Sequence, residues 1–363
     1  MSRRWTIPHV VRRRTCVATA PLPRPGTAPA QIARDAEWLA HRYDPTRDAV
    51  HFRRVTRAQH AAATFLTDDH LGDAAVTPIR RADALAAGPA SAPLHIVAHS
   101  AFCLSTLVAR AFDRPGWAMG IKEPVILNDL IGWQRRGGRP DEVRTVLDGA
   151  LTLLARPFSP GEAVVVKPSN TCNALVGPVL ELRPDARALL LEAPLPDFLN
   201  SIARKGLDGR LFVRKLLLGL LDDGLVDLGF DPRDLMGQTD LQVAATGWLA
   251  QHALFAKLAD RFGARIATLD SAALTADQGR AMFAIAHHFA LPLDDAGLAA
   301  ILAGPAFTRH SKTGANFGAA ARAAEQRDAA AVHAEEIGKV AIWADAVAKA
   351  AGIAMTLPRS LLA

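Results

Sequence analysis

From residue 94 onward, short apolar runs alternate with longer segments that have apolar residues at helical spacing. The runs LHIVA, WAMGI, AVVVK, ARALLLE and ARIATL are strand candidates, and nearly all are followed by a helical pattern such as PDEVRTVLDGALTLLA or PLPDFLNSIARKG. Continuous apolar strands separated by helices are typical of a parallel sheet that is covered on both faces. The last third of the chain carries two long amphipathic patterns. The pattern therefore predicts an α/β fold with a central parallel β-sheet flanked by helices and a helical C-terminal portion.

The first 90 residues do not follow this alternation. Residues 21–29 are rich in Pro, Ala and Gly, and a helical pattern starts near Gln31 in QIARDAEWLAHRY. The run AVHFRRV over residues 49–55 indicates a short strand, and a second loose stretch covers residues 84–93. We expect residues 1–90 to form an N-terminal extension or cap and residues 91–363 to form the main α/β domain.

Composition narrows the classes of partner. The chain has 363 residues and is half hydrophobic, which is enough for a sizeable core. Its formal charge of +6 favours anionic partners such as nucleotides, but the aromatic content of 6% and the lack of a basic stripe interleaved with aromatics argue against nucleic acid. The three cysteines have no metal-ligand spacing, and neither a signal peptide nor a membrane span is visible. We expect a cytoplasmic protein with no metal site; the oligomeric state cannot be read from the sequence.

The segment AHSAFCLST follows the first strand of the main domain. A helix that begins near Leu104 or Ser105 would direct its N-terminal amides toward a ligand, and the hydroxyls of Ser105 and Thr106 would add donors. His99 would add a positive charge when protonated. The Walker sequence GxxxxGK[ST] is absent, so an ordinary strand-to-helix connection competes with an anion site here.

The same segment also compares with the nucleophile elbow GxSxG of serine hydrolases. Ser100 stands at the centre of the elbow, and Asp270 and His310 follow in the order acid, then histidine. Phe102 occupies the place of the second glycine, where a bulky side chain would collide with the neighbouring strand and helix. This counts against the hydrolase.

A succession of segments decides between these possibilities. The order AHSAFCLSTLVARAFDRPG, KEPVILNDL, VVVKPSN, RPDARALLLEAPLPDFLNSI and ARIATLDSAAL, over about residues 93–322, resembles the sulfotransferase family of the P-loop superfamily. The resemblance lies in order and spacing more than in any one segment. It implies transfer of a sulfuryl group from 3′-phosphoadenosine 5′-phosphosulfate (PAPS), as co-substrate, to a hydroxyl or amine of a small molecule.

The resemblance also implies roles for individual residues. His99 stands at the place of a basic residue of the family's donor loop, and Lys167 matches the lysine of its KSPSH-like segment, so that both should face one cleft. Asn200 and Ser201 lie where a serine binds the 3′-phosphate. The implied donor-binding residues are Ser100, Ala101, Phe102, Cys103, Leu104, Ser105, Thr106, Asn200 and Ser201.

The chain departs from the family pattern at two places. The loop at residues 99–106 is longer and lacks glycine, and Glu192 and Ala193 replace the Arg and Asp of the family's RDP motif. A carboxylate at this place would repel the 3′-phosphate. Arg204 and Lys205 are candidate replacements for the missing cation. In the basic, glycine-containing segment FTRHSKTGANF, Arg309 and Lys312 resemble the family's donor-covering loop and are further candidates.

Glu123, in IKEP, is the expected general base, because it follows the second strand of the sheet and some members of the family use a carboxylate from such a position. Glu123 could instead be a surface carboxylate that pairs with Lys122 or caps the next helix. The departures also leave open a catalytically silent protein that binds a nucleotide or a protein partner.

Overall fold

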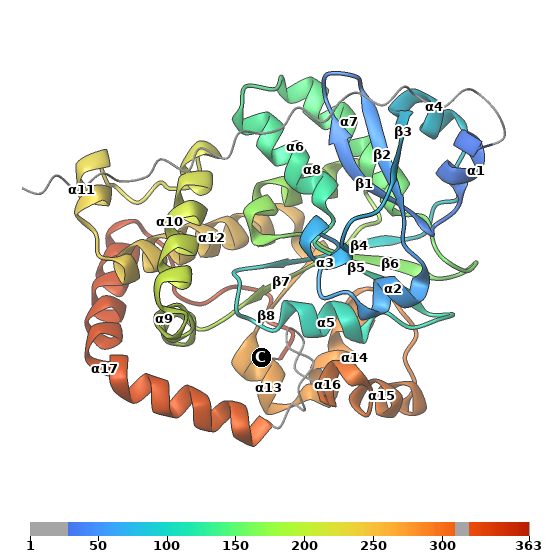
Figure 1. The fold of residues 1–363 in the computed structure, drawn as a ribbon. Coiled ribbons are helices and arrows are strands. Elements are labelled where there is room, and N and C mark those ends of the chain that lie inside the picture. Colours follow the sequence, from blue (N-terminus) through green and yellow to red (C-terminus); the bar gives the residue numbers. More distant parts are fainter. Residues whose placement is uncertain (1–27, 309–318, 363) are drawn as a thin grey trace, which may run out of the picture.

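The computed structural model describes residues 28–308 and 319–362, with side chains for residues 29–308 and 333–362. Over this range the chain is an α/β protein whose five-stranded parallel sheet lies between helices (Figure 1). A three-stranded antiparallel sheet forms near the N-terminus. Within the described ranges, no helix is long and apolar enough to cross a membrane. The predicted α/β architecture with a helical C-terminal portion is confirmed.

The five-stranded sheet consists of the five apolar runs that the sequence predicts as strands. Its strands are β4 (Leu94–His99), β5 (Ala118–Lys122), β6 (Ala163–Lys167), β7 (Ala188–Glu192) and β8 (Ile266–Asp270). They lie in the order β5, β6, β4, β7, β8, and every neighbouring pair is parallel. Nearly every strand residue is buried, as expected when helices cover both faces of a parallel sheet.

Helices cover the sheet and form the C-terminal portion. They are α5 (Ser105–Ala111), α6 (Val125–Arg135), α7 (Pro140–Leu154), the 3-10 helix η1 (Asn170–Leu175), α8 (Val176–Leu182), α9 (Leu195–Arg204), α10 (Gly206–Asp222), α11 (Pro232–Gly237), α12 (Asp240–Phe262), the 3-10 helix η2 (Gly263–Arg265), α13 (Ser271–Ala276), α14 (Gln278–His288), α15 (Asp295–Leu302), α16 (Pro305–Thr308) and α17 (Ala319–Ala350).

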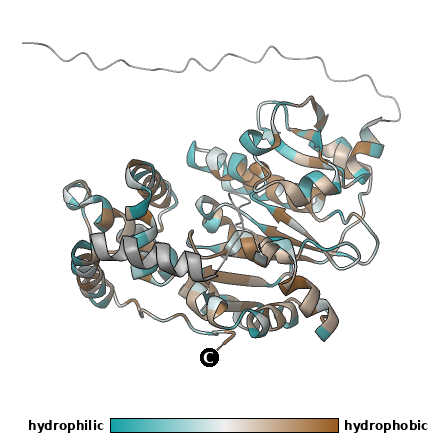
Figure 2. Cartoon of the chain, turned by 60° about the horizontal axis from the view of Figure 1, so that its bottom comes forward, coloured by the Kyte–Doolittle hydropathy of each residue, from teal (hydrophilic) through white to brown (hydrophobic). Residues whose placement is uncertain are grey.

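The two faces of the sheet belong to separate hydrophobic cores, because alternate strand residues point to opposite faces. Ile96 of β4 joins a core that includes α6, α7 and α8, whereas its neighbour Val97 joins a core that includes α5, α9 and α14. Figure 2 shows the hydrophobic colours concentrated on the sheet and on the helices that pack against it. The sheet, packed on both faces, therefore holds the residues at the carboxyl ends of its strands in fixed positions.

The N-terminal part of the described chain packs against one of these cores. Its elements are α1 (Ala28–Arg34), β1 (Trp38–Asp44), β2 (Ala49–Arg54), α2 (Arg57–Ala62), α3 (Asp68–Leu71), β3 (Val76–Arg80) and α4 (Arg81–Ala86). The strands pair in the antiparallel order β1, β2, β3. Ile32 and Phe52 belong to the same core as Ile96 of the central sheet. The division into residues 1–90 and 91–363 stays a prediction.

The helical pattern expected from Gln31 through Tyr43 is wrong in its second half. The helix α1 ends at Arg34, and residues 38–44 form β1, which pairs with β2 from Trp38 opposite Arg54 to Asp44 opposite Ala49. Apolar spacing in so short a segment fits either element, and pairing with a neighbouring strand overrides the local preference.

Arg156, which follows α7, anchors this N-terminal part from inside the protein. Its guanidinium is buried and donates hydrogen bonds of 2.6–3.2 Å to five backbone carbonyls, those of Ile32, Ala33, Asp35, Trp38 and Leu153. Burial lowers the pKa of Arg156 to about 10, so the side chain keeps its charge at neutral pH. One side chain thus provides hydrogen-bond donors for four backbone carbonyls between the end of α1 and the start of β1.

The strand order also indicates where a ligand site should lie. The chain leaves β4 toward β5 on one side of the sheet, and it leaves β7 toward β8 on the other side, although β4 and β7 are neighbours. In open parallel sheets, ligands bind beyond the carboxyl ends of the strands at such a reversal. The turn that follows β4 occupies this place.

Candidate functional site

Each strand of the central sheet ends in a titratable side chain at the same edge. The strand-end residues are His99 on β4, Lys122 and then Glu123 on β5, Lys167 on β6, Glu192 on β7 and Asp270 on β8. Because carboxyl ends of parallel strands meet at one edge, side chains from distant parts of the sequence are brought together here. Within the described part of the chain, no group of three or more His, Cys, Asp or Glu residues could hold a metal ion.

The turn after β4 is strained. Three residues that are not glycine have left-handed backbone angles: Ala101 (φ 78°), Phe102 (φ 54°) and Leu104 (φ 67°). Each such residue costs about 1–2 kcal/mol, and strain of this kind persists only where the surrounding structure enforces it. The amide of Ser100 donates to the carbonyl of Leu191 on β7 at 3.1 Å, which fixes the start of the turn. The chain thus makes a sharp turn at this place without glycine.

Two hydroxyls follow the turn at the start of α5. Ser105 and Thr106 are the first residues of this helix, and both are buried. A hydroxyl at a helix start beside a strained turn can donate to a phosphate or sulfate oxygen.

The other side chains of the turn position it. Phe102 packs against Phe198 of α9 and Phe212 of α10, with 5.9 Å between ring centroids in each pair. The Nζ atom of Lys205 lies 5.7 Å from the centre of the Phe102 ring. Burial raises the pKa of the Cys103 thiol, so Cys103 is not a reactive thiolate. Of the two candidate replacement cations, Lys205 therefore lies beside the turn.

The ring of His99 makes hydrogen bonds to the backbone on both sides. Its Nδ1 atom accepts from the amide of Ala101 at 3.1 Å, and its Nε2 atom lies 3.1 Å from the carbonyl of Pro168, to which it donates. Through these two hydrogen bonds, His99 holds the turn next to the end of β6. The role of His99 toward a donor stays a prediction.

Lys167 and Glu123 form an ion pair at the ends of β6 and β5. The ammonium group of Lys167 donates a hydrogen bond to the Glu123 carboxylate. Glu123 itself has a left-handed backbone (φ 53°), and its amide donates to the carbonyl of Lys167 at 2.7 Å. Glu123 thus pairs with Lys167 and not with Lys122. Since β6 lies between β5 and β4, Lys167 stands between Glu123 and the turn, and its charge acts on Cys103 within that turn.

Glu192 does not face the turn as an unpaired carboxylate. Its Oε2 atom lies 2.8 Å from Nδ1 of the buried His252 on α12, and Nε2 of His252 lies 2.8 Å from the carbonyl of Ala354. Both ring nitrogens of His252 therefore lie within hydrogen-bond distance of an oxygen atom. The carboxylate that the sequence led us to expect at the donor site is bound to His252.

We predict that Glu192→Gln lowers the free energy of unfolding by about 1–3 kcal/mol, because it leaves the buried His252 without its carboxylate. Urea unfolding at pH 7 measures this loss. Glu181→Gln is the matched control, since Glu181 pairs with Arg144 and Arg261 at the surface. This substitution should lower the free energy of unfolding by less than about 1 kcal/mol. Equal midpoints for the two variants would contradict the role of the Glu192–His252 pair.

The N-terminal part supplies a side chain that the sequence analysis missed. Phe65 lies in the segment between α2 and α3, and the centre of its ring is 5.1 Å from Nζ of Lys167. The amide of Leu66 donates to the carbonyl of Lys122 at 2.7 Å, which joins this segment to the end of β5. The position of Phe65 carries no sequence signal, because its neighbours in space are about 60 and 100 residues away in the chain.

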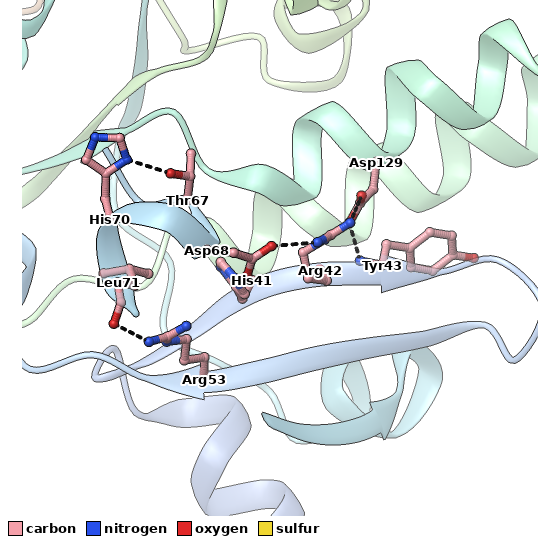
Figure 3. A network of polar contacts seen from close by, with 9 residues as sticks. All are labelled: His41, Arg42, Tyr43, Arg53, Thr67, Asp68, His70, Leu71 and Asp129. Carbon is pink, nitrogen blue, oxygen red and sulfur yellow. Dashed lines mark hydrogen bonds and ion pairs between the residues drawn. The ribbon is translucent and has the colours of Figure 1, made fainter. Parts of the chain in front are cut away.

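A network of polar contacts holds this segment in place (Figure 3). The carboxylate of Asp68 binds His41 at 2.6 Å and Arg42 at 2.7 Å, and Arg42 also binds Asp129 of α6 at 2.8 Å. The hydroxyl of Thr67 lies 2.8 Å from Nδ1 of His70. The start of α3, two residues after Leu66, is therefore tied both to β1 and to the helix that follows Glu123.

The structure also gives the burial of the other predicted residues that it describes. Asn200 is buried in α9 and Ser201 is half-buried beside it. Arg309 and Lys312 lie outside the described residues. Ser100 is buried, and its Oγ accepts from the amide of Ala193 at 3.1 Å.

The hydrolase arrangement gains no support. Asp270 caps α13 by accepting from the amide of Ala273 at 2.8 Å, and its strand β8 is two places from β4. His310 lies outside the described residues. A buried Ser100 whose hydroxyl holds a backbone amide does not offer an exposed nucleophile.

Comparisons with known proteins give limited similarity. No family model and no curated protein matches the chain. Among solved structures, a sulfotransferase domain from the curacin biosynthetic pathway matches with a TM-score of 0.37 and 12% identity, over 61% of this chain and 81% of that one. A sulfotransferase domain from the olefin synthase of Synechococcus PCC 7002 matches with a TM-score of 0.35 and 12% identity, over 64% of this chain and 84% of that one.

Proposed function

We propose that the protein is a sulfuryl transferase that uses PAPS as donor and a hydroxyl or amine of a small molecule as acceptor. The observation that carries the proposal is the grouping of the strained turn, the Ser105 and Thr106 hydroxyls and the Lys167–Glu123 pair at the reversal of the sheet. Sulfuryl transfer needs positioned positive charge and hydrogen-bond donors around an in-line reaction, together with a base for the attacking group.

The donor set at the turn fits a phosphosulfate. The hydroxyl of Thr106 can donate to a phosphate oxygen, and Ser105 precedes it on the same helix turn. Lys205 supplies a nearby ammonium group on the side of α9 and α10. PAPS, when bound, supplies the activated sulfuryl group, and these residues hold its phosphate end.

Lys167 and Glu123 act on the acceptor side. Glu123 is the partly exposed member of the pair and takes the proton of the attacking hydroxyl or amine. Lys167 is buried and carries the positive charge that compensates the oxygens of the transferred group. Phe65 lies against Lys167, so that it limits the access of water and contributes an apolar wall for the acceptor.

One observation favours a second candidate, a silent nucleotide-binding or partner-binding protein. Glu192 is bound to His252 at the place where the family resemblance implies an arginine. A protein with this substitution could bind a nucleotide that lacks the 3′-phosphate and perform no transfer.

An acceptor screen separates the two candidates. The full chain is incubated with PAPS and mixtures of small alcohols, phenols and amines, and the release of 3′-phosphoadenosine 5′-phosphate is followed. Acceptor-dependent release that Glu123→Gln lowers by about 10²–10⁴-fold supports the transferase. Binding of the nucleotide without release in any mixture favours the silent protein.

A further inference from the structure

The helix α10 is apolar on two sides. Its inner face buries Val213, Leu216, Leu217 and Leu220. Its outer face exposes four leucines, whose exposed fractions are 69% for Leu207, 57% for Leu211, 63% for Leu218 and 38% for Leu221. Single exposed leucines are common, but four on one helix face form a surface that usually serves an interaction.

The spacing of these leucines is symmetric. Leu207 and Leu221 lie seven residues before and after Arg214, and Leu211 and Leu218 lie three before and four after it. Steps of three, four and seven residues keep side chains on one face of a helix. A stripe that is symmetric about its midpoint matches itself when a second copy runs antiparallel to it.

We propose that a second copy of this chain docks on this stripe, so that two α10 helices pack antiparallel about a two-fold axis near residues 214 and 215. In such an isologous contact, Leu207 meets Leu221 of the partner subunit, and Leu211 meets Leu218 of the partner subunit. The proposal rests on the leucines of α10 and does not require the reaction proposed at the sheet edge, although Lys205 is used in both.

The charges along α10 agree with this orientation. The exposed Lys205 lies just before α10, and the exposed Asp222 is its last residue. An antiparallel pair brings the basic end of each helix to the acidic end of the other. Near the axis, Arg214 is bound to Asp240 at 2.7 Å, whereas the exposed Lys215 brings one positive charge from each copy to the contact. A parallel pair would bring like charges together at both ends.

The size of the contact indicates a reversible dimer. α10 has 17 residues and is therefore about 25 Å long, so a strip about 10 Å wide covers roughly 250 Å². A standard interface buries about 800 Å² on each partner. We therefore expect a dimer that dissociates on dilution.

Sedimentation velocity over a wide range of protein concentration tests the dimer. The full-length chain should shift from monomer toward dimer as its concentration rises, and Leu218→Glu should lower the association constant at least 10-fold. Ile342→Glu is the matched control, because Ile342 of α17 is 75% exposed but lies off the stripe. Circular dichroism confirms that both variants are folded. A wild type that stays monomeric, or a dimer that Leu218→Glu leaves unchanged, overturns the proposal.

Disulfide trapping tests the antiparallel register. Lys215→Cys, close to the axis, should give a covalent dimer under mild oxidation, whereas Asp208→Cys on the same helix should not, since position 208 lies near the opposite end of the partner helix and far from position 208 of the partner subunit. Crosslinking of both variants to the same extent overturns the antiparallel arrangement. A monomeric wild type that instead binds phosphatidylcholine vesicles through the leucines would show that the stripe contacts a lipid surface and would equally overturn the dimer.

Discussion

Arg156→Ala should lower the free energy of unfolding by about 3–5 kcal/mol. The guanidinium of Arg156 is buried and serves five backbone carbonyls, which the variant leaves without a donor inside the protein. It also loses the contact with the Phe52 ring, whose centre lies 5.5 Å from the guanidinium carbon. Chemical unfolding monitored by circular dichroism measures the loss.

Two further variants make this test specific. Arg156→Lys keeps the positive charge but offers three donors instead of five, so we expect an intermediate loss of about 2 kcal/mol. Arg139→Ala removes an exposed arginine that pairs with Asp141 and should cost less than about 1 kcal/mol. If Arg156→Ala unfolds at the same denaturant concentration as Arg139→Ala, the anchoring role of Arg156 is wrong.

Lys167→Met should lower the rate of sulfuryl transfer by about 10²–10³-fold if the proposed function is correct. The methionine keeps the volume of the side chain but removes the positive charge that is paired with Glu123 at the end of β6. Losing one preorganised group that stabilises charge in a transition state has an effect of this size. Single-turnover measurement of transfer from PAPS gives the rate directly.

The control for this variant is Lys257→Met, which removes an exposed lysine of α12. The Lys257→Met variant should transfer the sulfuryl group from PAPS at the wild-type rate. A Lys167→Met protein that is folded and retains more than about a third of the wild-type rate would remove Lys167 from the chemistry.

The parallel sheet was predictable because its strands are fully buried and therefore read as continuous apolar runs. The strand β1 was not predictable, since its segment WLAHRYD also fits a helical spacing and only its pairing with β2 decides the outcome. Local pattern thus specified the central sheet, whereas tertiary pairing specified the N-terminal one.

The order of the parallel strands could be used to expect which strand ends are neighbours. The strands β4 and β6 are neighbours, so the end of β6 with Lys167 lies beside β4, and the shared cleft of Lys167 and His99 stays a prediction. The partner of Glu192 could not be foreseen, because His252 follows 60 residues later on a helix whose packing the sequence does not give. Phe65 was missed for the same reason, since it reaches Lys167 from a part of the chain that resembles no donor-binding segment.

We expect the turn after β4 and its surroundings to bind a 3′-phosphorylated nucleotide. Calorimetric titration of the full chain with 3′-phosphoadenosine 5′-phosphate, adenosine 5′-phosphate and phosphate measures this binding. The 3′-phosphorylated nucleotide should bind about 10–100-fold more tightly than adenosine 5′-phosphate, because its extra phosphate adds charge-assisted hydrogen bonds of roughly 1.5–3 kcal/mol. Thr106→Val should weaken the binding of both nucleotides alike, because it removes a donor at the shared 5′-phosphate. Equal affinity for the two nucleotides, or no binding of either, would show that this site is not the donor site of a PAPS-dependent transferase.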